Sequence, residues 1–277
     1  NETEDPPGPA TNPRVGGSAS NPVYTTDTTP TLSWTAPTSG GDPTGYKVYV
    51  DGVLKTTVAH PTTSYTVSPA LTANGNLHSW SVVATNDGGD GPSMTGNGFR
   101  VGTAPSTVSL LTPAAGAYTT DRTPDFDWSD ATGTAPITYD FHFNGSAVTG
   151  STNLSTSAFT PTTNLAYGAG TWRVIAKNAY GQSQTGNRTV NIGTIPSTFS
   201  LTAPATGTKI AVANQSSVNL DWGDSTASGG ATATVKYDLQ INRGSGFVTE
   251  KAGLSASATT LSGLANGALP AGSKYTW

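Results

Sequence analysis

Apolar residues alternate with polar residues in one type of short run that occurs three times in the chain. Apolar side chains stand at every second position in GYKVYVDG (residues 45–52), TYDFHFNG (138–145) and KYDLQINRG (236–244). This period of two predicts strands with one buried face. The pairs Asp51-Gly52 and Asn144-Gly145 tolerate positive φ, so they predict tight hairpin turns after the first two strands.

Tryptophans repeat at equal intervals along the chain. Trp34, Trp128 and Trp222 end the runs TLSW, DFDW and NLDW, and their spacing is constant, since 128 − 34 = 94 and 222 − 128 = 94. A second tryptophan follows in each unit, at positions 80, 172 and 277. Because these indoles share a strand face with apolar neighbours, we expect them to be buried rather than to form a sugar-binding platform.

The pattern predicts an all-β chain of three tandem Greek-key β-sandwiches. No apolar spacing of the helical kind persists for three turns, and turn residues recur every few positions. Seven short strands in a unit of this length fit a two-sheet sandwich. The predicted segments are a flexible Pro-rich tether over 1–14 and domains over 15–102, 103–193 and 194–277, of which the third is incomplete at its C-terminus.

Composition excludes several classes of protein. Charged residues make up only 11%, the net charge is −4, and the 13 basic residues are scattered, so we expect no nucleic-acid partner. With no cysteine, each core must be stable without disulfides. No apolar run is long enough to cross a bilayer, and a chain that begins at Asn1 suggests that a segment has been removed before it.

The motifs resemble a known family of repeats. A tryptophan in the second strand, GYKVYV in the third and WSVVATNDGGDGPS near the end of the unit resemble tandem fibronectin type III and bacterial Ig-like repeats of extracellular surface proteins. The likeness covers most of residues 15–277, and it is weakest in the third unit, which stops at Trp277. The resemblance implies a secreted or surface-displayed bacterial module without a cofactor.

The end of the third unit bears on its stability. Without a full sixth and seventh strand, we expect apolar residues such as Leu220, Trp222 and Leu239 to be exposed. We expect the natural chain to continue. The alternative is strand donation from a neighbouring subunit, for which residues 8–23 are a poor donor because of their proline and glycine.

The connections between units are short and contain proline. GTAPST (residues 102–107) and GTIPST (193–198) leave little freedom, so we expect a semi-rigid array with a reach on the order of 100 Å.

Catalytic chemistry has little material in this sequence. Glutamate occurs three times, at positions 2, 4 and 250, so a pair of catalytic glutamates is not expected. His60, His78 and His142 lack metal-binding spacing and are expected to be surface or edge residues. We predict no catalytic, cofactor-binding or metal-binding residues.

Some polar and aromatic residues allow other interpretations. Paired aspartates recur at 127 and 130, at 221 and 224, and at 87 and 90; calcium sites are the alternative, and turn residues the expected reading. Tyr49 and Tyr180 are the candidates for exposed contacts. Sequons at Asn144, Asn153, Asn187 and Asn214 permit glycosylation in a host that performs it.

The function predicted from these observations is a non-catalytic stalk, spacer or adhesive module of an extracellular protein. Its partner is a protein or carbohydrate on a surface, or further copies in a fibre. One alternative is a subunit of an extracellular filament or phage fibre built by strand exchange or lateral contacts. The other is an accessory region of a polysaccharide-degrading enzyme.

Overall fold

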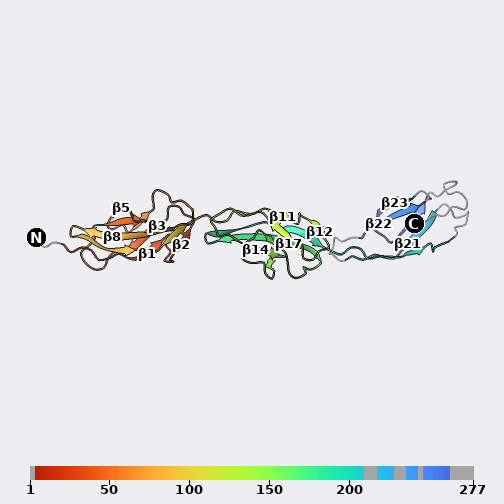
Figure 1. Ribbon diagram of the computed structural model, residues 1–277, viewed down its shortest axis with the longest axis horizontal. Coiled ribbons are helices and arrows are strands. Elements are labelled where there is room, and N and C mark those ends of the chain that lie inside the picture. The colour runs from red at the N-terminus through yellow and green to blue at the C-terminus, as the bar shows by residue number, and fades with distance from the viewer. Residues whose placement is uncertain (1–3, 209–216, 228–234, 243–245, 263–277) are drawn as a thin grey trace. The chain divides into compact units, whose positions relative to one another are not determined.

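A computed structural model of the protein describes residues 4–208, 217–227, 235–242 and 246–262. Every strand or helix assigned in these ranges is a β-strand (Figure 1), so the predicted all-β class is confirmed. Within the same ranges, no helix has the length and apolar character needed to span a membrane.

The first repeat consists of two main sheets and one small one. Their strand orders are β1-β3-β6, β5-β4-β8-β9 and β2-β10-β7. The strands of this repeat are β1 (Thr11–Val15), β2 (Val23–Thr25), β3 (Thr31–Thr35), β4 (Gly45–Val50), β5 (Val53–Ala59), β6 (Ser64–Thr66), β7 (Leu77–His78), β8 (Trp80–Asn86), β9 (Gly89–Thr95) and β10 (Phe99–Val101).

The second repeat has the same plan, with a longer central strand, β17. Its sheets have the orders β11-β13-β16 and β12-β19-β17-β14-β15, and β18 also pairs with β17. Strand β12 runs parallel to β19, as β2 runs parallel to β10 in the first repeat. The strands are β11 (Leu110–Thr112), β12 (Ala117–Thr119), β13 (Phe126–Trp128), β14 (Thr138–Phe143), β15 (Ser146–Ala147), β16 (Ala158–Phe159), β17 (Gly168–Asn178), β18 (Gly181–Gln184) and β19 (Arg188–Ile192).

The described part of the third repeat contains two sheets, of order β20-β21-β24 and β22-β23. Their strands are β20 (Leu201–Ala203), β21 (Ser217–Trp222), β22 (Tyr237–Asn242), β23 (Phe247–Leu254) and β24 (Ala258–Ser262). The prediction that this repeat lacks its last strands concerns residues outside the described ranges.

One ring contact recurs between the two sheets of each repeat. The pairs are Trp34 with Tyr46, Trp128 with Tyr139 and Trp222 with Tyr237; their centroids are 5.4, 5.7 and 5.4 Å apart and their planes meet at 63°, 66° and 62°. This edge-to-face geometry is favourable for aromatic pairs. The pair joins the sheet of the first tryptophan to the sheet of the alternating strand, so it holds the two layers of each sandwich together.

The buried residues follow the predicted alternation. Trp80 and Trp172 are at most 2% exposed, and the apolar positions of β4, β14 and β22 are all buried, which confirms that the indoles fill the cores. Trp277 lies outside the described residues. Both residues of each predicted turn take positive φ: 50° and 75° at Asp51 and Gly52, and 49° and 86° at Asn144 and Gly145. The predicted hairpins are therefore confirmed.

Two expectations differ from the structure. Residues 4–14 are not a tether: β1 includes residues 11–14, and Pro7 and Ala10 are buried, because this segment pairs with β3 and packs on the first sandwich. The pairing of β1 with β3 and of β2 with β10 also engages part of the segment considered as a strand donor, at residues 11–15 and 23. Leu220, Trp222 and Leu239 are buried rather than exposed, since they form one apolar cluster.

The described contacts divide the chain into two compact units. One comprises residues 1–112, 126–159 and 173–187, and the other comprises 113–125, 160–172 and 188–277. Because the division passes through the second repeat, the unit limits differ from the repeat limits. The domain boundaries at 15–102, 103–193 and 194–277 stay a prediction.

Candidate interface between the first and second repeats

Tyr180, in the turn between β17 and β18, packs against the first repeat. Its ring lies 5.6 Å from the ring of Tyr24 on β2, at an angle of 72°. A Cβ built on Gly102 would lie 2.5 Å from Cζ of Tyr180, and one on Gly75 would lie 3.3 Å from its Oη. The backbone therefore passes under the Tyr180 ring at a distance that only glycine permits.

Burial of the Tyr180 phenol raises its pKa, and the nearby Arg100 guanidinium opposes that effect. Arg100 donates from Nη1 to the carbonyl oxygen of Gly75 at 2.7 Å. Tyr180 therefore stays neutral at physiological pH, as a ring packed in an interface requires. Tyr180 is half-buried and packs against Tyr24, so the expectation that it is an exposed contact residue is wrong.

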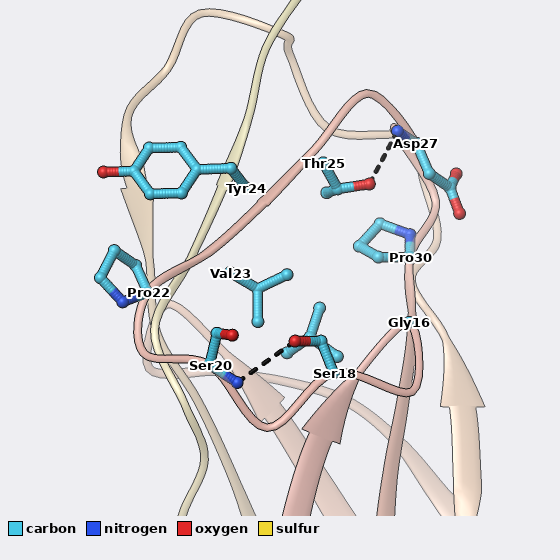
Figure 2. Close-up of a pocket in the computed structure, with 10 residues that line it drawn as sticks. Gly16, Ser18, Ser20, Pro22, Val23, Tyr24, Thr25, Asp27 and Pro30 are labelled. Carbon is cyan, nitrogen blue, oxygen red and sulfur yellow. Dashed lines mark hydrogen bonds between the residues drawn. The ribbon is translucent and has the colours of Figure 1, made fainter. Parts of the chain in front are cut away.

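Tyr24 comes from a long loop that also forms a pocket. The loop from Val15 to Tyr24 is four residues longer than the corresponding loop from Pro113 to Tyr118, because 24 − 15 = 9 and 118 − 113 = 5. The longer loop, from Val15 to Tyr24, lines an open pocket of about 340 Å³. In Figure 2 the Val23 side chain lies within the pocket, and the Tyr24 phenol points away from it. The loop thus presents the Tyr24 ring outward.

An asparagine in the same turn holds the connecting segment. Asn178 donates from Nδ2 to the carbonyl oxygens of Thr103 and Thr134, both at 2.8 Å, and its Oδ1 accepts a hydrogen bond from the Tyr180 amide at 2.9 Å. Thr103 and Thr134 are also joined directly, since the Thr103 amide donates to Oγ1 of Thr134 at 2.8 Å. One side chain thereby fixes the connection, the β13–β14 loop and the turn that carries Tyr180.

The first repeat contains the same asparagine arrangement. Asn86 donates from Nδ2 to the carbonyl oxygens of Asp5 and Asp42, at 2.8 and 3.3 Å, and its Oδ1 accepts from the Gly88 amide at 2.9 Å. Glycine occupies the position of Tyr180 here. The asparagine is therefore part of each of these two sandwiches, whereas, of the two, only the second has an aromatic residue at this turn position.

The other residues considered from the sequence lie apart from this interface. Tyr49 is half-buried on β4, across from Leu54 and Ser81. Nδ1 of His60 is 3.1 Å from the Tyr46 hydroxyl, and Nδ1 of His78 is 2.7 Å from a carboxylate oxygen of Asp51. The third histidine, at position 142, is half-buried on β14. The three histidines lie on separate segments: His60 after β5, His78 on β7 and His142 on β14.

The paired aspartates do not converge on a common point. Asp90 forms an ion pair with Lys47 at 2.7 Å, whereas Asp87, in the β8–β9 turn, and Asp130, in the loop after β13, are exposed. Across the described ranges, no group of three or more His, Asp or Glu side chains is placed to hold a metal ion. Of the sequons, Asn144 and Asn153 are exposed with φ of 49° and 55°, and Asn187 is exposed; Asn214 lies outside the described residues.

The sequence reasoning missed Asn86 and Asn178 as interface residues. Each follows the buried tryptophan by six residues, since 86 − 80 = 6 and 178 − 172 = 6. That recurrence was the available signal. Their partners were not accessible from the pattern, because the accepting carbonyl oxygens are backbone atoms of residues up to 81 positions away.

Comparison with known proteins adds a fold likeness only. No family model and no curated protein matches the chain. It is similar to the fibronectin(III)-like modules of Clostridium thermocellum CbhA, with 16% identity over 65% of this chain and 93% of that chain and a TM-score of 0.38. It is also similar to the chicken CNTN1 FN1-FN3 domains (14% identity, 93% and 88% covered, TM-score 0.29) and to domains A168-A170 from titin (17%, 96% and 90%, 0.37).

The fold itself rests on the strand pairing. In each of the first two repeats, a three-stranded sheet packs against a longer sheet that contains the alternating strand, and a buried tryptophan of the first sheet contacts the second. This is the two-layer sandwich of fibronectin type III and Ig-like repeats. The predicted architecture is confirmed as a fold, with the number of complete sandwiches still a prediction. At these identities, the similar structures do not assign an activity to this chain.

Proposed function

We propose that this protein is a non-catalytic spacer module of a secreted or surface-displayed bacterial protein, whose sandwiches are joined by packed connections. The observation that carries the proposal is the interface at Tyr180. A free connection would leave that tyrosine in solvent, whereas here it lies over Gly102 and against Tyr24. Asn178 additionally hydrogen-bonds the connection to the second sandwich. Such a joint transmits orientation from one repeat to the next.

The edges of the sheets support a spacer in preference to a fibre built by lateral strand pairing. Strand β9 contains Pro92, which lacks an amide donor, and β15 has only two residues. Strand β5 carries Lys55 at a register shift. Proline, short length and a charged residue at a bulge are features that prevent edge-to-edge association. An adhesive role for the outer sheet faces remains compatible with this design, with a surface protein or carbohydrate as the ligand.

The spacer proposal is tested by measuring the distance distribution across the interface. The chain has no cysteine, so spin labels attach only at the introduced Thr57→Cys and Ser146→Cys, on exposed residues of β5 and β15. Pulsed electron paramagnetic resonance is expected to give one narrow distribution in this parent and a broad one after Tyr180→Ala. Tyr118→Ala is the matched control, because Tyr118 occupies the position of Tyr24 in the second repeat and is 71% exposed. A broad distribution in the parent would refute the proposal.

A further inference from the structure

Residues 4–8 lie in a groove of the first sandwich, which we call the entry groove. Its walls are the β3–β4 loop, at residues 39–42, and the end of the β8–β9 hairpin, at residues 86–91. Three hydrogen bonds hold the segment: Asn86 Nδ2 donates to the Asp5 carbonyl at 2.8 Å, the Gly41 amide to the Pro6 carbonyl at 3.3 Å, and the Gly8 amide to the Ser39 carbonyl at 2.7 Å. All three involve backbone atoms of the segment, and Pro7 is buried.

Glycines shape the entry groove for close approach of a backbone. A Cβ on Gly41, Gly88 or Gly91 would collide with the carbonyl oxygen of Asp5, Glu4 or Pro7, respectively. None of these three glycines has the positive φ that would itself require glycine. Their role is therefore to leave room for the segment. The entry groove recognises an extended proline-containing backbone, and the exposed side chains of the segment contribute little.

The second repeat has an equivalent groove, filled in the same way. There the segment 103–106 contains Pro105, and the asparagine is Asn178. Gly133 and Gly181 face the segment, where an added Cβ would lie 3.0 and 3.2 Å from atoms of Ala104, but both also have positive φ, of 150° and 148°. Ser183 donates from Oγ to the carbonyl oxygen of Ser106 at 2.8 Å. Two sandwiches of one chain thus bind an extended proline-containing segment at the same place, which identifies the class of ligand from the structure itself.

We propose that the entry groove of the first repeat is an intermolecular docking site, in which residues 4–8 of a second copy replace the chain's own segment. The occupant follows from the groove, since the second copy offers the same backbone and proline and restores all three hydrogen bonds. Exchange of an identical element has a low intrinsic cost, because the lost contacts are made again in trans. The chain between the groove and β3 also favours release: Asn12 has φ of 55° and the β1–β3 register shifts between Thr11 and Arg14.

The test uses the full chain in two differently labelled forms. One form carries Glu4→Cys with a nitroxide on this exposed residue, and the other is ¹⁵N-labelled without a nitroxide. When the two are mixed at several hundred micromolar, paramagnetic broadening is expected at the amides of Gly41, Gly88 and Gly91, and it should decrease on dilution. The control donor carries Gly186→Cys with the same nitroxide, because a side chain there meets no atom within 4 Å.

A blocked acceptor makes the result specific. Gly91→Ala places a methyl group where the Pro7 carbonyl oxygen lies, so it should abolish the broadening in a ¹⁵N-labelled acceptor whose amide spectrum otherwise keeps its dispersion. Gly186→Ala in the acceptor should leave the broadening unchanged. Broadening at the groove amides no greater than with the control donor overturns the proposal, as does equal broadening in the Gly91→Ala acceptor. The spacer role does not depend on either outcome.

Discussion

Replacing Asn178 with alanine is expected to destabilise the second repeat by about 2 kcal/mol. The substitution removes two hydrogen bonds donated to carbonyl oxygens and one accepted from an amide. At about 1 kcal/mol each, the gross loss is about 3 kcal/mol. Thr103 is exposed, so water replaces part of the lost interaction at its carbonyl oxygen. The remaining loss is large for a turn residue, because the same side chain holds three segments.

Asn191→Ala is the matched control for this prediction. Asn191 has the same side chain in the same repeat, and its Nδ2 donates a hydrogen bond to the carbonyl oxygen of Gly116 at 3.1 Å. We expect a loss of about 1 kcal/mol there. Urea unfolding monitored by tryptophan fluorescence gives both free energies, and hydrogen exchange at residues 103–106 reports release of the connection. Equal losses for the two variants, or unchanged exchange at 103–106 in Asn178→Ala, would refute the reasoning.

Three further predictions concern the core, the interface and acid stability. Trp172→Ala removes a fully buried indole and should cost about 3–5 kcal/mol in urea unfolding, whereas the exposed Tyr118→Ala should change stability by less than about 0.5 kcal/mol. Gly102→Ala should displace the Tyr180 ring and broaden the spin-label distribution as Tyr180→Ala does, with no additional broadening in the double variant, since both changes disrupt one contact. Burial disfavours the charged form of Asp140, but the hydrogen bonds from Lys177 and the Asn153 amide outweigh it and lower the pKa of Asp140. A depressed folded-state pKa stabilises the protein above the unfolded value of about 3.9, and that contribution is lost as pH falls through the folded-state value. Thermal unfolding between pH 6 and pH 2 should therefore show a smaller acid-induced decrease in Asp140→Asn, and an identical decrease would contradict the assignment.

The alternation of side chains was sufficient to predict the local elements. A strand such as β4 can be recognised because its buried and solvent-facing residues differ at every second position, and a turn such as Asn144-Gly145 because few residues tolerate its φ. The spacing of the tryptophans likewise predicted the repeats and the burial of the indoles. These features depend on short-range geometry, which the order of residues contains directly.

The contacts between the first and second repeats could be found only in the tertiary structure. Tyr180 and Tyr24 are far apart in sequence, and Gly102 has a role there only because a ring lies above it. Residues 4–8 read as a solvated tether because their composition is acidic and rich in proline, yet backbone carbonyls and glycine walls, which carry no pattern of apolar side chains, hold them on the sandwich. The amino-acid sequence alone thus determined which strands form and which faces they bury. Only the fold decided which loops meet, because such contacts are set by where distant backbones pass close to one another.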